Sequence, residues 1–150
     1  MAAGDRFDLE RFVSAQATNY ESALAEIRAG GKRSHWMWYV FPQIAGLGRS
    51  AMAQRYAIGS RAEAQAYLDH PLLGVRLRDC VAALADLPNP DPVRVFGDID
   101  AAKLRSSLTL FEAASGAPLF AEALDRSFGG RRDEATMKLL EASEDGTDGR

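Results

Sequence analysis

The chain has few residues of several types, and each shortage excludes a class of protein. Cys80 is the only cysteine among 150 residues, which excludes an internal disulfide and a cysteine-rich zinc site. His35 and His70 are the only histidines, and no carboxylates stand at metal-ligand spacing around them. We therefore expect neither a metal site nor a cofactor.

Positive charge is also scarce. Lysine and arginine total 18 against 21 acidic residues, which gives a formal net charge of -3, and only three of the basic residues are lysines. Proteins that bind a phosphate backbone usually carry a basic excess. Bulk nucleic-acid binding is therefore not expected, although this balance permits a local basic pocket.

Long apolar runs are missing as well. The longest uninterrupted one covers residues 36–42, far short of the roughly 20 residues that a membrane helix needs. The first residues contain acids and lack the apolar segment of a secretory signal. We expect a cytoplasmic protein with no membrane partner, consisting of one domain over residues 1–142 and a disordered polar tail over 143–150. No pattern indicates an oligomeric state.

The apolar residues that are present recur mostly at three- and four-residue steps. This periodicity predicts an all-α fold of seven or eight short helices in a single domain. Residues 34–41 suit a strand or a short buried helix, and we favour the helix because no strand of similar quality exists elsewhere. The short apolar piece 93–96 is expected to be a lone extended segment. The predicted helices cover 8–29 with an alternative break near Asn19, 34–41, 51–58, 61–69, 72–87, Asp98 or Asp100 to about 116, 118–128, and a last one capped by Asp133.

The strongest local signal is at residues 34–43, Ser-His-Trp-Met-Trp-Tyr-Val-Phe-Pro-Gln. This string contains both tryptophans, one of the two histidines and four of the thirteen aromatic residues. Such a run either nucleates a core or lines a ligand cleft. The turn before it, Gly30-Gly-Lys-Arg-Ser34, combines glycines with cations as a phosphate cradle does, and residues 46–50 and 129–133 form similar turns. Each turn can equally be a simple helix end with solvated cations.

These patterns predict a site for a small phosphorylated or nucleotide-like ligand. The predicted walls are Trp36, Trp38 and Phe41, and the predicted polar contacts are Lys32, Arg33, His35, Gln43, Arg76, Lys103 and Ser107. If the protein is an enzyme, His35 or Asp100 activates water to hydrolyse an ADP-ribosyl or related nucleoside N-glycosidic bond.

Each of these residues also has a structural alternative. Arg76 would then form an ion pair with a neighbouring acid, and Asp100 would cap a helix. Gln16, on an apolar stripe, would point inward to a ligand or to a neighbouring helix end, and Cys80 would be a small core residue. In this alternative the chain is a non-enzymatic protein-interaction domain whose aromatic string is core.

Many short strings in the chain resemble one family. They include residues 31–43, Gly46-Leu-Gly48, Tyr56-Ala-Ile58, Phe96-Gly97, Lys103-Leu104, Ser106-Ser107 and Thr109-Leu-Phe111. Together they resemble an uncharacterised bacterial and fungal domain-of-unknown-function family that is sometimes mislabelled calpastatin. The resemblance covers about residues 7–141 and implies a compact all-helical fold without an established activity. Residues 103–128 are also loosely similar to the helical NADAR domains that remove ADP-ribose from modified guanine bases, which is the source of the hydrolytic hypothesis.

Overall fold

In the computed structural model, residues 5–148 are described, and the side chains are described as far as residue 142. This part of the chain forms nine helices and no β-sheet, which confirms the predicted all-α class. The count exceeds seven or eight because the segment 8–29 divides near Asn19. The helices are α1 (Glu10–Gln16), α2 (Tyr20–Arg28), α3 (Met37–Val40), α4 (Ala51–Arg55), α5 (Arg61–Asp69), α6 (Leu73–Ala85), α7 (Pro92–Ser115), α8 (Pro118–Phe128) and α9 (Glu134–Asp148).

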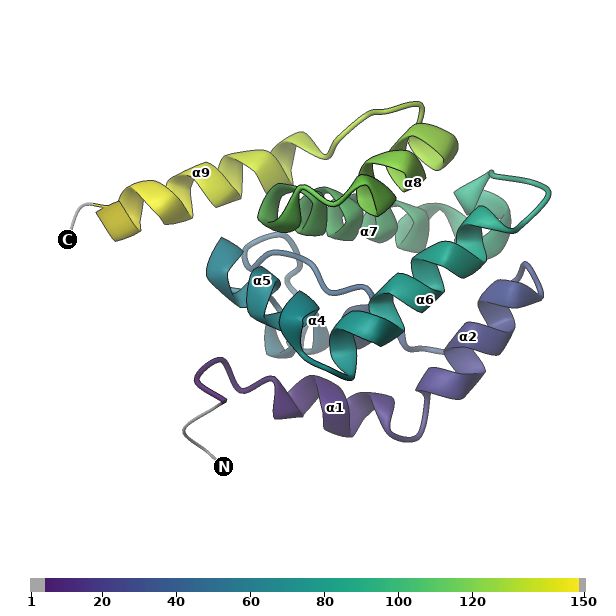
Figure 1. Cartoon of the computed structure of the whole chain (residues 1–150), viewed down its shortest axis with the longest axis horizontal. Helices are drawn as coiled ribbons and strands as arrows, with labels where there is room; N and C mark the ends of the chain where they lie inside the picture. The colour runs from purple at the N-terminus through teal and green to yellow at the C-terminus, as the bar shows by residue number, and fades with distance from the viewer. Residues whose placement is uncertain (1–4, 149–150) are drawn as a thin grey trace.

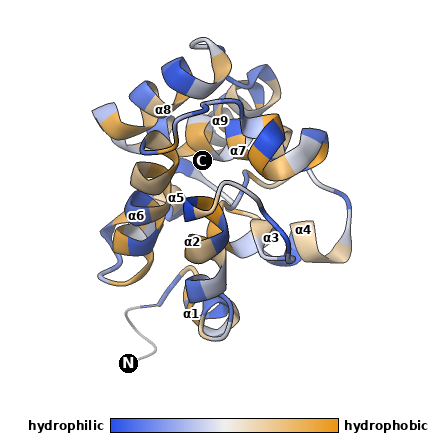
Figure 2. Cartoon of the chain, turned by 90° about the vertical axis from the view of Figure 1, so that its right-hand side faces the viewer, coloured by the Kyte–Doolittle hydropathy of each residue, from blue (hydrophilic) through white to orange (hydrophobic). Residues whose placement is uncertain are grey.

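The helices lie in three tiers. Helices α7, α8 and α9 lie along one side, α1 and α2 lie toward the opposite side, and α4, α5 and α6 lie between them (Figure 1). The view turned by 90° keeps α7, α8 and α9 together at one end and α1 at the other (Figure 2). None of the helices in residues 5–148 is both long enough and apolar enough to cross a membrane.

A chain of aromatic rings forms the centre of the core. Phe12 of α1 meets Tyr67 of α5 edge-on at 5.1 Å between ring centroids, and Tyr67 lies 5.3 Å from Phe111 of α7. Phe111 in turn lies 6.0 Å from Phe120 of α8. Burial of such rings is the main source of stability in a domain of this size, so this series ties four helices from all three tiers together.

Helix boundaries set by local chemistry follow the predictions closely. Ser50 and Ser60 each accept a backbone N–H bond of 3.1 Å, from Ala53 and Glu63, at the starts of α4 and α5. Helix α8 has the predicted bounds, since Pro118 begins it and Gly129 ends it in the left-handed conformation. Helix α4 ends at Arg55 rather than near 58, because Ile58 instead forms an isolated parallel bridge with Ile44.

Two predictions about the middle of the chain are wrong. Residues 93–96 are not extended: they form the first turn of α7, where Pro92 is pre-shaped for a helix and Asp91 Oδ1 accepts the Val93 N–H. The helix predicted to begin at Asp98 or Asp100 is the continuation of α7 across Gly97. The backbone of Gly97 has φ 80° and ψ 170°, so α7 is kinked there.

The aromatic string gives only one helical turn. Helix α3 covers Met37–Val40 instead of 34–41, because the Ser34 hydroxyl donates to Glu26 at 2.6 Å and does not cap the helix. Helix α9 begins after Asp133, whose Oδ2 accepts the Thr136 N–H at 3.1 Å. The helix continues to Asp148, through most of the segment 143–150 that was predicted as a disordered tail. Residues 149–150 lie outside the described residues. The division of the chain into a domain ending at 142 and a tail stays a prediction.

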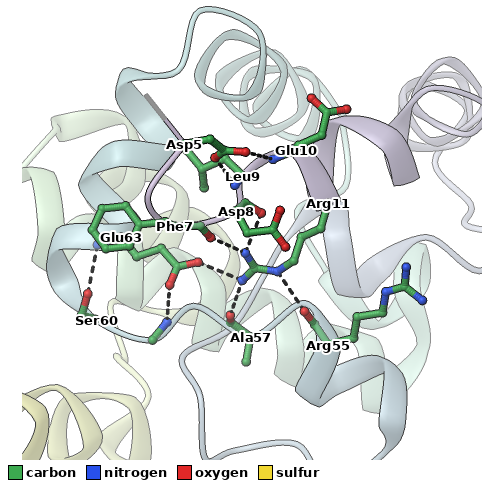
Figure 3. A network of polar contacts seen from close by, with 11 residues as sticks. Asp5, Phe7, Asp8, Leu9, Glu10, Arg11, Arg55, Ala57, Ser60 and Glu63 are labelled. Carbon is green, nitrogen blue, oxygen red and sulfur yellow. Dashed lines mark hydrogen bonds and ion pairs between the residues drawn. The ribbon is translucent and has the colours of Figure 1, made fainter. Parts of the chain in front are cut away.

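One arginine fixes the N-terminal segment to the middle tier (Figure 3). All five N–H donors of Arg11 are used, and one of their acceptors is the carboxylate of Glu63, which is itself buried. Only a planar guanidinium can serve five acceptors at once. The acceptors are the carbonyls of Phe7, Asp8, Arg55 and Ala57 and the Glu63 carboxylate, at 2.6 to 2.9 Å.

Candidate functional site

A cavity of about 560 Å³ lies between the turn that precedes α3 and the kink in α7. The backbone N–H of Lys32 donates to the Val95 carbonyl at 2.7 Å, so this turn is fixed against the first turn of α7. Five predicted site residues therefore meet in one place. The lining residues are Lys32, His35, Met37 and Trp38 on one side and Phe96, Gly97, Asp98, Ile99, Asp100 and Lys103 on the other.

Asp100 bridges the two lysines of the cavity. Its Oδ2 lies 2.9 Å from Lys32 Nζ, and its Oδ1 lies 3.5 Å from Lys103 Nζ. The Lys32 side chain is only 9% exposed, whereas that of Lys103 is 25% exposed. Asp100 therefore does not cap a helix, as the alternative predicted. It forms ion pairs that join α7 to the turn before α3.

Each lysine also lies over an indole. Lys32 Nζ is 5.1 Å from the ring centroid of Trp36, and Lys103 Nζ is 5.3 Å from that of Trp38. Both distances permit cation–π attraction, which favours the charged ammonium in a partly dry site. The lysines are therefore held in place by aromatic faces as well as by Asp100.

The apolar wall of the cavity is partly open to solvent. Trp38 is half-buried, and Ile99 is 75% exposed. The exposed imidazole of His35 lies 6.5 Å from the Trp38 ring centroid, with 30° between the ring planes. Phe96 packs behind this wall against Trp36 at 6.2 Å. The cavity thus combines accessible aromatic and aliphatic surface with ammonium, carboxylate and imidazole groups.

Glu26 is a polar residue of this region that sequence reasoning missed. Its carboxylate accepts the backbone N–H groups of Arg33 and Ser34 at 2.8 and 3.0 Å and the Trp36 indole N–H at 2.9 Å. Burial raises the pKa of Glu26, but these bonds and the Ser34 hydroxyl outweigh it and lower the pKa to about 2. Its partners lie seven to ten residues downstream, beyond Gly30 and Gly31, so no local pattern in the sequence indicates the role.

This arrangement changes the meaning of the Gly30-Gly-Lys-Arg-Ser34 turn. The backbone N–H groups of Arg33 and Ser34, which were predicted to face a ligand phosphate, donate to the carboxylate of Glu26 instead. The side chain of Arg33 points to solvent and does not line the cavity. Lys32 is the one residue of the 30–34 turn that lines the candidate site.

The other predicted residues do not line the cavity. Trp36 and Phe41 are fully buried core residues, and Gln43 lies next to the bridge, where its carbonyl accepts the Ile58 N–H at 2.8 Å. Ser107 is fully buried on α7, and its hydroxyl has no hydrogen-bond partner within the described residues.

Arg76 has a separate structural role. Its guanidinium lies 4.6 Å over the ring of Tyr20 and donates to Gln16 Oε1 at 3.3 Å, in place of the ion pair that was the alternative. Gln16 is buried as predicted, and its amide donates to the Tyr39 carbonyl at 2.7 Å. Burial raises the pKa of Cys80 to about 12, which disfavours the thiolate at neutral pH.

Two further hollows lie elsewhere. An open one of about 620 Å³ surrounds the turn at 129–133, where Arg105 and Arg131 are accompanied by Asp133 and Glu134. A narrower apolar one of about 290 Å³ lies between α6, α7 and α8. Within residues 5–142, no three His, Cys, Asp or Glu side chains are grouped so that they could hold a metal ion.

Comparison with known proteins places the chain in a family. A crystal structure of the conserved hypothetical protein Rv1873 from Mycobacterium tuberculosis is similar to it, with 49% sequence identity and a TM-score of 0.89. The similarity covers 91% of this chain and 99% of that chain. No protein with a curated description matches the chain. Residues 6–140 match the model of the family described as "Protein of unknown function (DUF1810)", and the chain therefore belongs to that family.

Proposed function

We propose that the chain binds a small phosphorylated or nucleotide-like ligand in the cavity between Lys32 and the Gly97 kink. The observation that carries this proposal is the convergence of scarce residues. Two of the three lysines, one of the two histidines and the half-buried tryptophan line one cavity, although they come from two segments about 60 positions apart.

The chemistry of the lining suits such a ligand. A planar base gains roughly 1 to 3 kcal/mol when it stacks on an aromatic side chain, and Trp38 is the accessible ring here. Lys103 is the more exposed of the two ammonium groups and supplies the contact for a phosphate oxygen. Ile99 adds apolar surface that a ligand would cover.

Asp100 and His35 line the same cavity and supply an enzymatic form of the proposal, the hydrolysis of a nucleoside N-glycosidic bond. Water attacks the anomeric carbon of the ribose while the carbon–nitrogen bond breaks and its electron pair leaves with the nitrogen. The Asp100 carboxylate accepts the proton of the attacking water, and the departing nitrogen takes a proton from solvent water while the neutral His35 imidazole donates a hydrogen bond to it.

Binding is tested by thermal unfolding of the purified protein with nucleotides, ADP-ribose and sugar phosphates. A ligand at about 100 times its Kd stabilises by about 2.7 kcal/mol, which raises the Tm of a 150-residue domain by roughly 5 to 10 °C. We expect the Lys103→Met variant to lose at least about tenfold in affinity, since it loses a charged contact. Lys138→Met is the matched control, because Lys138 is the remaining lysine and is exposed on α9.

The outcomes separate the two functions that the sequence suggests. A Tm increase that is lost in Lys103→Met and kept in Lys138→Met supports the site. If no compound raises the Tm of the wild-type protein, the ligand proposal fails, and the non-enzymatic interaction domain becomes the better description.

Hydrolysis is tested separately, by incubating the protein with ADP-ribosylated guanosine and with simple nucleosides and measuring release of the base by chromatography. A general base contributes about 10² to 10⁴ in rate, so Asp100→Asn should lower turnover at least about 100-fold. Asp86→Asn is the control with the same change of charge, because Asp86 is exposed at the end of α6 and does not line the cavity. If no substrate is turned over, the hydrolytic proposal is rejected. The binding proposal is then decided by the thermal-unfolding assay alone.

A further inference from the structure

The charged side chains that line the cavity cancel one another. Two ammonium groups, of Lys32 and Lys103, face two carboxylates, of Asp98 and Asp100, so their formal charges sum to zero. Sites for polyphosphates usually present an excess of positive charge to match the ligand. This cavity does not.

The two lysines are also unequal in what they can offer. Lys32 is almost fully covered, pairs with Asp100 at 2.9 Å and lies over the Trp36 ring. Moving its ammonium group to a ligand would leave Asp100 with only the longer 3.5 Å contact. A partly buried carboxylate that loses its closest partner is costly.

Lys103 is more exposed, and its contact with Asp100 is longer, so it can turn toward a ligand while Lys32 keeps Asp100 neutralised. The cavity therefore has one ammonium group to offer. A second or third negative charge on the ligand would meet Asp98 and Asp100 without a further cation to compensate it.

We propose, given the ligand site proposed above, that the cavity selects nucleosides whose phosphate is a phosphodiester with a single negative charge, such as cyclic nucleotides. Monophosphates and polyphosphates carry more charge than Lys103 can match and bind more weakly. Uncharged nucleosides leave Lys103 without a new partner and also bind more weakly. ADP-ribose, with two charges on its diphosphate, ranks below a phosphodiester.

The test measures the dissociation constants of adenosine, cyclic AMP, AMP, ADP and ATP by titration calorimetry, at fixed ionic strength and without divalent cations. We expect the tightest binding for cyclic AMP, about tenfold or more tighter than for ATP, and a weaker Kd for adenosine than for cyclic AMP. This ranking uses the wild-type protein and needs no variant.

The Asp100→Asn variant tests the cause of the ranking. It removes the carboxylate that holds Lys32, so the cavity gains one positive charge and its affinity for ATP should rise about tenfold. Asp98→Asn changes the net charge equally but removes an exposed carboxylate, so its effect should be smaller. Far-ultraviolet circular dichroism of both variants verifies that they are folded before titration.

The failures of the two proposals differ. If none of the five compounds binds, the charge selection is rejected, and the ligand site itself is rejected if no compound of the thermal assay raises the Tm either. If they bind and affinity rises with each added phosphate, the site stands and the charge selection is rejected. Equal binding of adenosine and cyclic AMP also rejects the selection, because Lys103 then contributes nothing.

Discussion

At the scale of single residues, Glu26 shows how a protein can fill an anion site with its own carboxylate. Three hydrogen bonds reach this side chain from the turn that carries Lys32, and a fourth comes from the buried indole of Trp36. The bonds fix the start of the aromatic string. Glu26 is therefore a positioning residue for one side of the cavity without lining it.

The Glu26→Gln variant should be less stable than the wild type by about 2 kcal/mol at pH 7, because hydrogen bonds to a charged group are lost. The folded pKa of Glu26 is about 2, below the ordinary 4.5, so its contribution is fully present above about pH 4.5 and is lost as pH falls toward 2. Urea denaturation at pH 7, 4 and 3 should show the difference between the two proteins narrowing.

The matched control for this comparison is Glu21→Gln, since Glu21 is exposed in the same helix. It should change the free energy of unfolding by less than about 0.5 kcal/mol at every pH. A wild-type advantage over Glu26→Gln that stays constant from pH 7 to pH 3 would show that the Glu26 charge is not what stabilises the turn.

Residue types also explain which of the predicted site residues line the cavity. Lys32 and Lys103 have long, charged side chains, so each reaches the cavity from its own segment. Trp36 and Phe41 have the same chemistry as Trp38, but the turn of α3 directs them into the core. Composition alone cannot distinguish the three rings.

At the scale of helices, local signals were sufficient for several helix ends that depend on their own residues. The caps at Ser50, Ser60 and Asp133 are examples, because each acceptor and donor lie within three residues. The first turn of α7 was missed because a four-residue apolar piece has no measurable period. Its packing against the Lys32 turn is a tertiary contact.

Gly97 is the position at which α7 depends most on residue identity. Its backbone, at φ 80° and ψ 170°, occupies a region that essentially only glycine adopts. Gly97→Ala should therefore cost about 1 to 3 kcal/mol in the free energy of unfolding, although a Cβ there would meet no atom within 4 Å. Urea denaturation at neutral pH measures the loss.

Gly31→Ala is the matched control for Gly97→Ala. A Cβ at Gly31 also meets no atom within 4 Å, and the backbone there is not in the positive-φ region, so stability should change by less than about 1 kcal/mol. Because Gly97 lines the cavity, its variant should also weaken ligand binding. Equal stability of the two alanine variants would exclude backbone strain as the reason for glycine at 97.

At the scale of the whole molecule, the sequence predicts the all-α class well, since periodicity alone determines which faces of the helices are buried. The cavity could be predicted only in part. Its residues were nominated by type, but the pairing of Asp100 with Lys32 joins α7 to a turn about 70 positions earlier. Tertiary packing also determines that Glu26 fixes the start of the aromatic string and that Arg76 lies over Tyr20, away from the cavity.

The two tryptophans have different surroundings, so their fluorescence should respond differently to the solvent. The indole of Trp36 is sealed in the core and hydrogen-bonded to Glu26, whereas that of Trp38 borders the cavity beside His35 and Lys103. A quencher dissolved in the solvent should therefore reach the indole of Trp38 and not that of Trp36. If a ligand binds at the proposed site, the change in fluorescence should come mainly from Trp38, which borders the cavity, and less from the buried Trp36.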